Sequence, residues 1–395
     1  MPRQQALLGW RDLTAPIMRR AEVFVSGPYW IVEVCLLAML FSVLFTGGVD
    51  EILYDMRVKY DNGYFVKIEH PLSDVSKDFG ASTHEAKLNF RLTVPVVLHW
   101  LPIRVVRDWW FLPGLTGCAI CGILAACGLF TYRVTGDRVC GFWMVLGVAS
   151  TYIGTFYTTR YYDAIALFQL LLAMLPGVHW SARGLLVFTA AFTDERAFVA
   201  APLLLFANRA DQPRNVWGRM TQPSSLAVIG GMVAYYIGRL LLAKYAGLVS
   251  VMDGVGLRTV ALNARYWHEG VWFALGGGWL LVGLCMLSLW QEGQKLELGM
   301  FACAVAAPIL VGFMVLDIVR STAYALPAVL VALTVLRRHE TTARLRAFCL
   351  AAFVLSVVAG DFGIFRNPWH SPPLVVKWLS AALQAVLPGG GIPPQ

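Results

Sequence analysis

Residues 29–55 read YWIVEVCLLAMLFSVLF-TGGVDEILYD, an apolar run that ends at Phe45 and is followed by three carboxylates, Asp50, Glu51 and Asp55. An apolar run of this kind predicts a membrane-spanning helix. A single helical turn after it would place the three acids near one face at the membrane boundary. Acids crowded there repel one another and keep a raised proton affinity, which suits a general base. The alternative interpretation is the solvated start of a loop.

The composition of the chain predicts an all-α polytopic membrane protein. Of its 395 residues, 58% are hydrophobic and only 14% are charged, which is too little charge for a soluble protein of this size. The formal net charge of +8 comes from basic residues in short loops between apolar runs. That pattern follows the positive-inside rule rather than a nucleic-acid-binding stripe, and it predicts a cytoplasmic N-terminus.

Apolar runs divide the chain into one transmembrane domain, residues 1–395, with about nine full spans. The predicted spans cover residues 29–46, 109–131, 139–157, 161–178, 224–247, 271–290, 298–316, 321–336 and 344–360. They leave a cytoplasmic tail over residues 1–28, a first extracytoplasmic loop over 47–108 and an extracytoplasmic tail over 361–395. Within the loop, residues 88–102 predict a juxtamembrane helix with Trp100 at headgroup depth.

The segment 183–208 carries Asp194, Glu195 and Arg196 in the middle of an apolar run. A single crossing here would put the following arginines on the wrong side of the membrane, and would leave charges at membrane depth. We therefore expect a broken helical hairpin whose tip faces the outer cavity. The alternative is an internal ion pair between Glu195 and Arg196 with no catalytic part.

The predicted spans place a group of acidic and basic residues at the outer face of the membrane. The candidate substrate- and phosphate-binding residues are Arg91, Asp163, Asp194, Glu195, Arg196, Arg239, Lys244, His268, Asp317 and Arg320. Arginine binds phosphate through two parallel hydrogen bonds, and a carboxylate can accept the proton of an attacking hydroxyl. For Arg239 and Lys244, snorkelling of the side chain to the headgroups is the alternative.

Motifs for nucleotide binding, zinc proteases and serine hydrolases are missing from the sequence. His70, His84 and His99 share the first outer loop, but their spacing matches no metal pattern. Cys118 and Cys121 have redox or metal spacing but lie in a predicted membrane helix, where packing is the simpler interpretation. We therefore predict no metal site, and whether a divalent cation assists stays open.

Four short features together resemble the bacterial GT-C-fold membrane glycosyltransferases. They are Asp50-Glu51 directly after the first span, Arg91-Leu-Thr-Val-Pro95 in the same loop, Asp194-Glu195-Arg196 at a helix tip, and Asp317-x-x-Arg320 before a later span. The resemblance implies a GT-C-like bundle and an inverting glycosyltransferase. Such an enzyme moves a hexose or pentose from a polyprenyl-phosphate carrier to an acceptor hydroxyl on the extracytoplasmic face of a bacterial inner membrane.

The resemblance also implies roles for individual residues. Asp50 would be the base, with Glu51 and Asp55 as the next choices, and Arg196, Arg320 and Arg239 would hold the lipid phosphate. The implied donor is a polyprenyl-phosphate sugar within the membrane lipid, and the acceptor is a glycan, a lipid or a protein. The chain is shorter than many members of that family and lacks an obvious soluble C-terminal domain, which leaves acceptor recognition unassigned.

Three alternatives stay open. A lipid-linked polysaccharide polymerase or ligase would use the same kind of substrate, although its long outer loop usually comes late in the chain. A secondary transporter would place its ionisable residues near the bilayer midplane in two related halves. A purely structural membrane subunit would leave the acids at membrane depth without a role.

Overall fold

The computed structural model describes residues 15–45, 62–79, 85–108, 110–154, 162–207, 218, 220–249, 256–315 and 317–358. Every regular element in these ranges is helical. Beside an unlabelled helix over residues 15–24, the elements are α2 (Trp30–Phe45), α4 (Asn62–Glu69), α5 (Ser76–Phe79), η1 (Glu85–Phe90), α6 (Thr93–His99), α7 (Ile103–Val106), α8 (Phe111–Thr135), α9 (Arg138–Ala149), α10 (Asp163–Met174), α11 (Trp180–Thr193), α12 (Glu195–Ala200), η3 (Ala201–Phe206), α14 (Pro223–Tyr245), α15 (Leu257–Asn263), α16 (Trp267–Leu275), α17 (Gly278–Gln291), α18 (Lys295–Met314), α19 (Ile318–Thr322), η4 (Ala323–Ala325), α20 (Leu326–Leu336) and α21 (Thr342–Val358).

Four helices of the described chain are long and apolar enough to cross a membrane: Phe111–Thr135, Pro223–Tyr245, Lys295–Met314 and Ile318–Leu336. The bent pair α16 and α17 would make a fifth span if it is counted as one. Shorter apolar helices cover Trp30–Val43, Arg138–Ala149 and Asp163–Met174. These helices are compatible with an integral membrane protein, while the expected total of about nine full spans stays a prediction.

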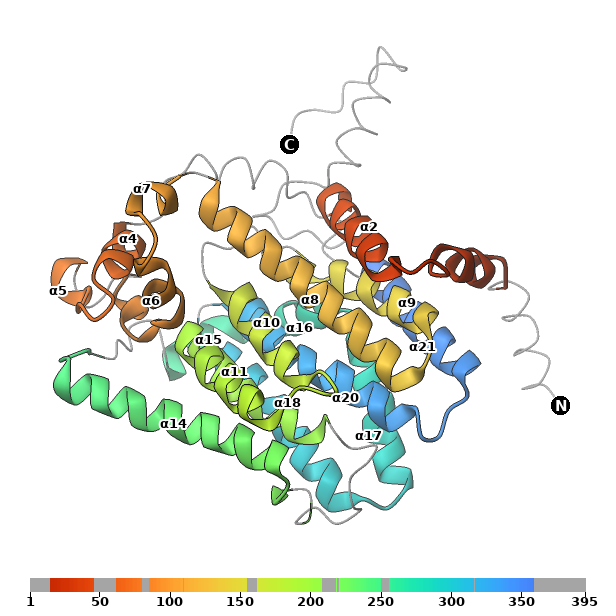
Figure 1. Cartoon of the computed structure of the whole chain (residues 1–395). Coiled ribbons are helices and arrows are strands. Elements are labelled where there is room, and N and C mark those ends of the chain that lie inside the picture. Colours follow the sequence, from red (N-terminus) through yellow and green to blue (C-terminus); the bar gives the residue numbers. More distant parts are fainter. Residues whose placement is uncertain are drawn as a thin grey trace, which may run out of the picture.

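The centre of the bundle consists of helices that are buried on all sides. Every residue of α20 is buried, and so is every residue of α9 after Arg138. A helix that is apolar all round belongs in such a position. In contrast, α14 buries only four residues and lies along the lower edge of the bundle in Figure 1, packed on α11.

The predicted interruption of segment 183–208 is present. α11 ends at Thr193, Asp194 is extended, and α12 begins at Glu195. The chain then returns along the bundle, because Phe206 packs on Phe301 near the first residues of α18 (ring centroids 5.6 Å apart). Asp194 lies at the other end, beside Arg196 and the first residue of α10. The turn therefore sets a charged tip inside the helical bundle.

One predicted span, residues 271–290, is broken in the structure. α16 and α17 meet at an angle of 91°, with the break at Gly276 and Gly277. Gly276 has φ +50°, and a Cβ at Gly277 would lie 1.9 Å from the Ala352 carbonyl oxygen. Only glycine allows this backbone conformation together with such a close approach of α21. The run of three glycines at 276–278 carried this signal, although the apolar run predicted one full span over residues 271–290.

Part of the first outer loop forms a small helical subdomain, α4 to α7, at one end of the bundle (Figure 1). Its own apolar core contains Tyr64, Ile68, Leu88 and Leu98. The predicted juxtamembrane helix corresponds to η1 and α6, and Trp100 at the end of α6 is 83% exposed. An exposed tryptophan at such a place is typical of a membrane-interface residue.

Candidate functional site

The predicted base residues, Asp50, Glu51 and Asp55, lie outside the described residues, as do residues 1–14 and the tail 361–395. The role of these acids stays a prediction. The other candidate residues are described, and most of them come together at the tip of the α11–α12 turn.

Asp194 organises the tip. Its backbone is extended (φ −153°, ψ 127°), so it ends α11, and its side chain caps α12 by accepting a hydrogen bond from the Arg196 backbone amide at 3.0 Å. Aspartate is among the preferred N-cap residues because its short side chain reaches the free amides of the first turn. The sequence Thr193-Asp194-Glu195-Arg196 thus produces both the break in the helix and the orientation of the next residues.

Arg196 is enclosed by two carboxylates. Its Nε donates to Asp194 Oδ1 at 2.8 Å and its Nη2 donates to Asp194 Oδ2 at 2.6 Å, which is the paired geometry that guanidinium and carboxylate favour. The same Nη2 also donates to Asp163 Oδ1. All three side chains are buried, with exposed fractions of 7% or less. Charges at this depth require such compensation.

The contacts continue on both sides of this core. Arg91 Nη2 lies 3.3 Å from both Asp194 Oδ2 and Glu195 Oε1. On the other side, Arg320 Nε lies 3.5 Å from Asp163 Oδ2 and 3.0 Å from Asp317 Oδ2. We call the resulting row the ionic chain. Its members are Glu195, Arg91, Asp194, Arg196, Asp163, Arg320 and Asp317, all of them predicted from the sequence as site residues.

The outer loop delivers Arg91 through backbone hydrogen bonds to the end of α11. The Leu92 amide donates to the Phe192 carbonyl at 2.7 Å, and the Thr93 hydroxyl donates to the Thr189 carbonyl at 2.7 Å. The first of these bonds gives a partner to a carbonyl in the last turn of α11, where no further helical amide follows. Both bonds connect the loop subdomain to the charged tip.

Exposure varies along the ionic chain in a regular way. Its two terminal acids are the accessible members, because Glu195 and Asp317 have side chains that are 45% and 42% exposed. The interior members Asp163 and Asp194 are fully buried. Three arginines face four carboxylates, so the fully ionised chain carries a formal charge of −1. The accessible groups are thus carboxylates. Glu195 is bound by Arg91 and Asp317 by Arg320, and another anion that binds these arginines would compete with the carboxylates.

Buried tyrosines that the sequence analysis did not select surround the ionic chain. The Tyr324 hydroxyl donates to the backbone carbonyl of Asp163 at 3.3 Å, and the Arg196 guanidinium lies 5.4 Å from the centre of the Tyr324 ring. Tyr162, next to Asp163, packs edge-on against Tyr64 of the loop subdomain (5.3 Å). Tyr324 lies one helical turn after Arg320, and this spacing was the available signal.

Three predicted site residues lie outside the ionic chain. Arg239 donates to the Tyr235 hydroxyl at 2.8 Å and its guanidinium stacks on Phe90 (4.3 Å), the neighbour of Arg91 in sequence. Lys244 is exposed and lies over the ring of Tyr245. His268 is exposed and faces only Glu269 among its described charged neighbours, at 3.7 Å. Arg239 therefore borders the candidate site, while the structure does not bring Lys244 and His268 into it.

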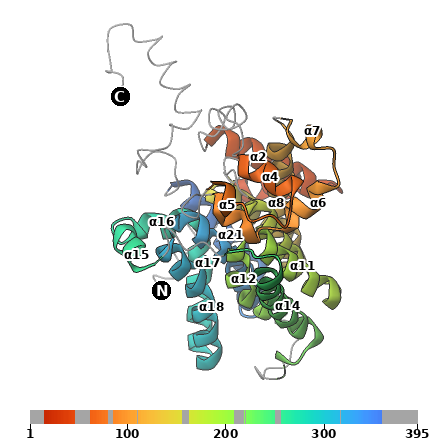
Figure 2. The same ribbon diagram turned by 90° about the vertical axis from the view of Figure 1, so that its left-hand side faces the viewer.

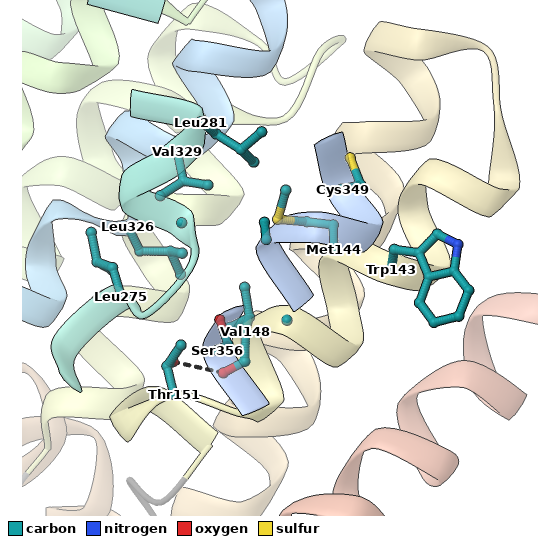
Figure 3. A pocket seen from close by; sticks show the side chains of 13 residues that line it. Trp143, Met144, Val148, Thr151, Leu275, Leu281, Leu326, Val329, Cys349 and Ser356 are labelled. Carbon is teal, nitrogen blue, oxygen red and sulfur yellow. Dashed lines mark hydrogen bonds between the residues drawn. The ribbon is translucent and has the colours of Figure 1, made fainter. Parts of the chain in front are cut away.

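A separate small cavity lies between α9, α16, α17, α20 and α21 (Figure 3). Its volume is about 20 Å³, and Thr151, Cys349 and Ser356 are among the few polar side chains in its wall. This is room for about one water molecule and far too little for a sugar. The cavity is therefore no part of the candidate site.

Across the described ranges, no three His, Cys, Asp or Glu side chains are grouped so that they could hold a metal ion. The eight cysteines are free thiols in the structure. Comparisons of this chain with protein-family models, with curated proteins and with solved structures give no match.

Proposed function

We propose that this protein is an inverting membrane glycosyltransferase with a GT-C-like architecture. It would move a sugar from a polyprenyl-phosphate carrier to an acceptor hydroxyl at the extracytoplasmic face of a bacterial inner membrane. The observation that carries the proposal is the ionic chain, which gathers three arginines and four carboxylates at one end of an apolar helical bundle. Groups of this kind suit a reaction that needs a proton acceptor and a bound phosphate.

In the proposed reaction, a carboxylate accepts a proton and the lipid phosphate is the leaving group. The acceptor hydroxyl attacks the anomeric carbon, the bond from that carbon to the phosphate oxygen breaks, and polyprenyl phosphate leaves with the bonding electrons. The hydroxyl proton passes to a carboxylate, for which Asp50 is the first choice and Glu51 and Asp55 are the next. Attack on the face opposite the leaving phosphate inverts the anomeric centre.

The geometry refines the expected role of the arginines. Arg196 is occupied by two buried carboxylates, so we assign it to positioning rather than to phosphate binding. Arg91 and Arg320 each hold an exposed acid at the end of the ionic chain, and Arg239 borders it. A lipid phosphate would displace Glu195 or Asp317 from its arginine as the anomeric bond breaks, because the leaving phosphate gains a second negative charge and accepts paired hydrogen bonds from a guanidinium.

The direct test measures sugar transfer by the purified protein in lipid nanodiscs, with radiolabelled polyprenyl-phosphate hexoses and pentoses as donors. We expect Asp50→Asn to lower the transfer rate by about 10²–10⁴-fold without loss of folded protein. Asp78→Asn, an exposed acid of the same loop, is the control and leaves the rate unchanged. Full activity of Asp50→Asn would refute the base assignment, and no transfer from any donor by the wild type would refute the proposed function.

A secondary transporter is the second candidate, because the described chain contains two interrupted helices, at Asp194 and at Gly276–Gly277. Transporters use broken helices to build their binding sites. Proteoliposomes separate the two functions. A transporter would accumulate an unmodified solute against an imposed ion gradient, whereas a transferase would convert the donor lipid without any gradient. A polysaccharide polymerase or ligase would also convert it, but only with a glycan acceptor.

A further inference from the structure

An open apolar groove of about 590 Å³ lies between η3 and α18, at the opposite end of α18 from the ionic chain. Its wall includes Pro202, Leu205, Leu296, Met300, Cys303 and Ala307. Lys295 is the single charged side chain among the described residues that line it. An apolar concavity with a cation at one end is the shape that an anionic amphiphile fits.

The lining residues of α18 lie on one face of that helix. Leu296, Met300, Cys303 and Ala307 follow one another at intervals of three or four residues. From Leu296 to Ala307 the helix rises roughly 16 Å, at about 1.5 Å per residue. The hydrocarbon core of a bilayer is about 30 Å thick, so the groove covers about half of it, the depth of one leaflet.

Lys295 lies at the end of the bundle that faces away from the loop subdomain. Figure 2 shows α18 extending downward to this end, while α4 to α7 gather at the top. The neighbouring turns are polar: His339 pairs with Glu292 at 2.6 Å, and Arg337 and Arg338 are exposed. Polar turns of this kind mark headgroup depth. Lys295 is exposed there at the mouth of the groove.

We propose that this groove binds an anionic phospholipid of the leaflet at the Lys295 end, with one acyl chain along α18 and its phosphate beside the Lys295 ammonium. The proposal uses the length of the groove, its apolar wall and the charge at its mouth. It does not depend on the proposed transfer reaction, since the lipid-binding groove and the ionic chain lie at opposite ends of the bundle.

The first test fills the groove. A Cβ at Gly299, a lining residue of α18, would meet no atom within 4 Å, so a leucine side chain there enters the groove without a backbone clash. Gly283 of α17 is also exposed with no atom within 4 Å of a Cβ, and does not line the groove. It is the matched control. The measurement is native mass spectrometry of full-length protein released from nanodiscs that contain equal amounts of phosphatidylglycerol and phosphatidylethanolamine.

We expect the wild type and Gly283→Leu to retain a bound phospholipid, and Gly299→Leu to lose at least about five-sixths of it, a sixfold change that corresponds to roughly 1 kcal/mol. The same lipid occupancy in Gly299→Leu and in the wild type would overturn the proposal.

The second test addresses the charge. Lys295→Gln should keep an acyl chain in the groove but lower the preference for phosphatidylglycerol over phosphatidylethanolamine by about fivefold, the effect of one basic side chain near a membrane surface. Arg19→Gln removes an exposed charge that does not line the groove, and should leave the preference unchanged. An unchanged preference in Lys295→Gln would refute the assigned headgroup position.

Cys303 offers a readout without any change in the groove. It is an exposed free thiol in the lining, and Cys118 is the other exposed thiol in the described part of the chain. In a Cys118→Ser background, a lipophilic maleimide should modify Cys303 rapidly in delipidated protein and at least about fivefold more slowly after phosphatidylglycerol is added back. Equal rates in the two samples would contradict occupation of the groove by lipid.

Discussion

The guanidinium of Arg196 neutralises two buried carboxylates at once. Removing it would leave Asp194 with only Arg91 and Asp163 with only Arg320, at 3.3 and 3.5 Å, and a buried carboxylate that loses its best arginine is costly. Charge neutralisation also explains why these residues lie where the helix is broken. The extended backbone at Asp194 turns its side chain back onto Arg196. At the residue scale, the ionic chain is therefore held together by charge neutralisation.

We predict that Arg196→Ala lowers the free energy of unfolding by about 3–5 kcal/mol. The measurement is the loss of folded protein on heating or in denaturant, followed by tryptophan fluorescence in detergent. Asp163→Asn combined with Arg196→Ala should recover part of the loss, because it removes one of the two buried acids that Arg196 neutralises. An unchanged stability of Arg196→Ala would show that Arg91 and Arg320 are enough to neutralise the two acids.

A second prediction at this scale concerns Glu195, the exposed acid that Arg91 holds. If a lipid phosphate displaces it, Glu195→Gln weakens the competitor and should lower KM for the donor by up to about fivefold, the upper end of the range for one exposed ion pair. Glu269→Gln, an exposed acid outside the ionic chain, is the control. A higher KM for Glu195→Gln would instead assign Glu195 to substrate binding.

At the element scale, α11 and α14 cross at very close range. A Cβ on Gly231 of α14 would lie 2.5 Å from the Gly184 carbonyl oxygen of α11, and a Cβ on Gly184 would lie 2.9 Å from the Ala227 carbonyl oxygen. Small residues allow such crossings in membrane helices. The crossing matters for the site, because α11 ends at the charged tip and α14 carries Arg239 beside it.

Gly231→Val should separate the two helices and reduce stability by about 1–3 kcal/mol, the usual range for overpacking. Gly230→Val is a control on the same helix, since a Cβ at Gly230 would meet no atom within 4 Å. Both variants change the helix propensity of α14 equally. The difference between their thermal unfolding midpoints therefore measures the cost of crowding α11 at Gly184. Equal unfolding midpoints for the two variants would mean that α11 and α14 can move apart without loss of stability.

The loop subdomain contains a lysine that has no exposed surface. Lys67 Nζ donates to the Ser73 carbonyl at 2.8 Å, and burial lowers the pKa of Lys67 to about 8, with Asp74 opposing the shift. The unfolded chain binds this proton up to its ordinary pKa of 10.5, while the folded chain releases it near 8. The unfolded state therefore binds more protons between these values, and stability rises with pH across that window.

This gives a pH prediction. The midpoint of thermal unfolding should increase from pH 8 to pH 10 in the wild type relative to Lys67→Met, in which this contribution is missing. The difference between the two proteins is the measurement, because other titrating groups are common to both. Parallel pH profiles would show that Lys67 keeps its charge in the folded protein.

At the scale of the whole molecule, the return of the chain at Asp194 predicts which segments lie on the same side of the membrane. Ser181 lies at the start of α11, and Thr221 lies just before α14. If the segment rises and returns, both residues face the same side of the membrane. A single crossing would place them on opposite sides.

Cysteine substitutions in a cysteine-free chain test this topology. A membrane-impermeant maleimide added to sealed inside-out vesicles should label Ser181→Cys and Thr221→Cys alike, and should not label Lys77→Cys of the loop subdomain. Labelling of only one of the first two would contradict the hairpin. The pattern would also test the predicted cytoplasmic N-terminus and the extracytoplasmic position of the ionic chain.

The sequence by itself determined that the chain is helical and contains helices apolar enough to span a membrane, because long apolar runs are local features that require no knowledge of their neighbours. It also selected all seven members of the ionic chain, since charges at membrane depth are rare enough to stand out. The break at Asp194 was predictable for the same reason.

Only the tertiary structure decided which charges pair. Arg196 meets Asp163 from 33 residues away and Arg91 meets Glu195 from 104 residues away, and these encounters depend on how whole helices pack. Packing also decided the bend at Gly276, where α21 approaches the backbone, and the groove between η3 and α18. Such contacts join distant parts of the chain, so no periodicity within one segment encodes them.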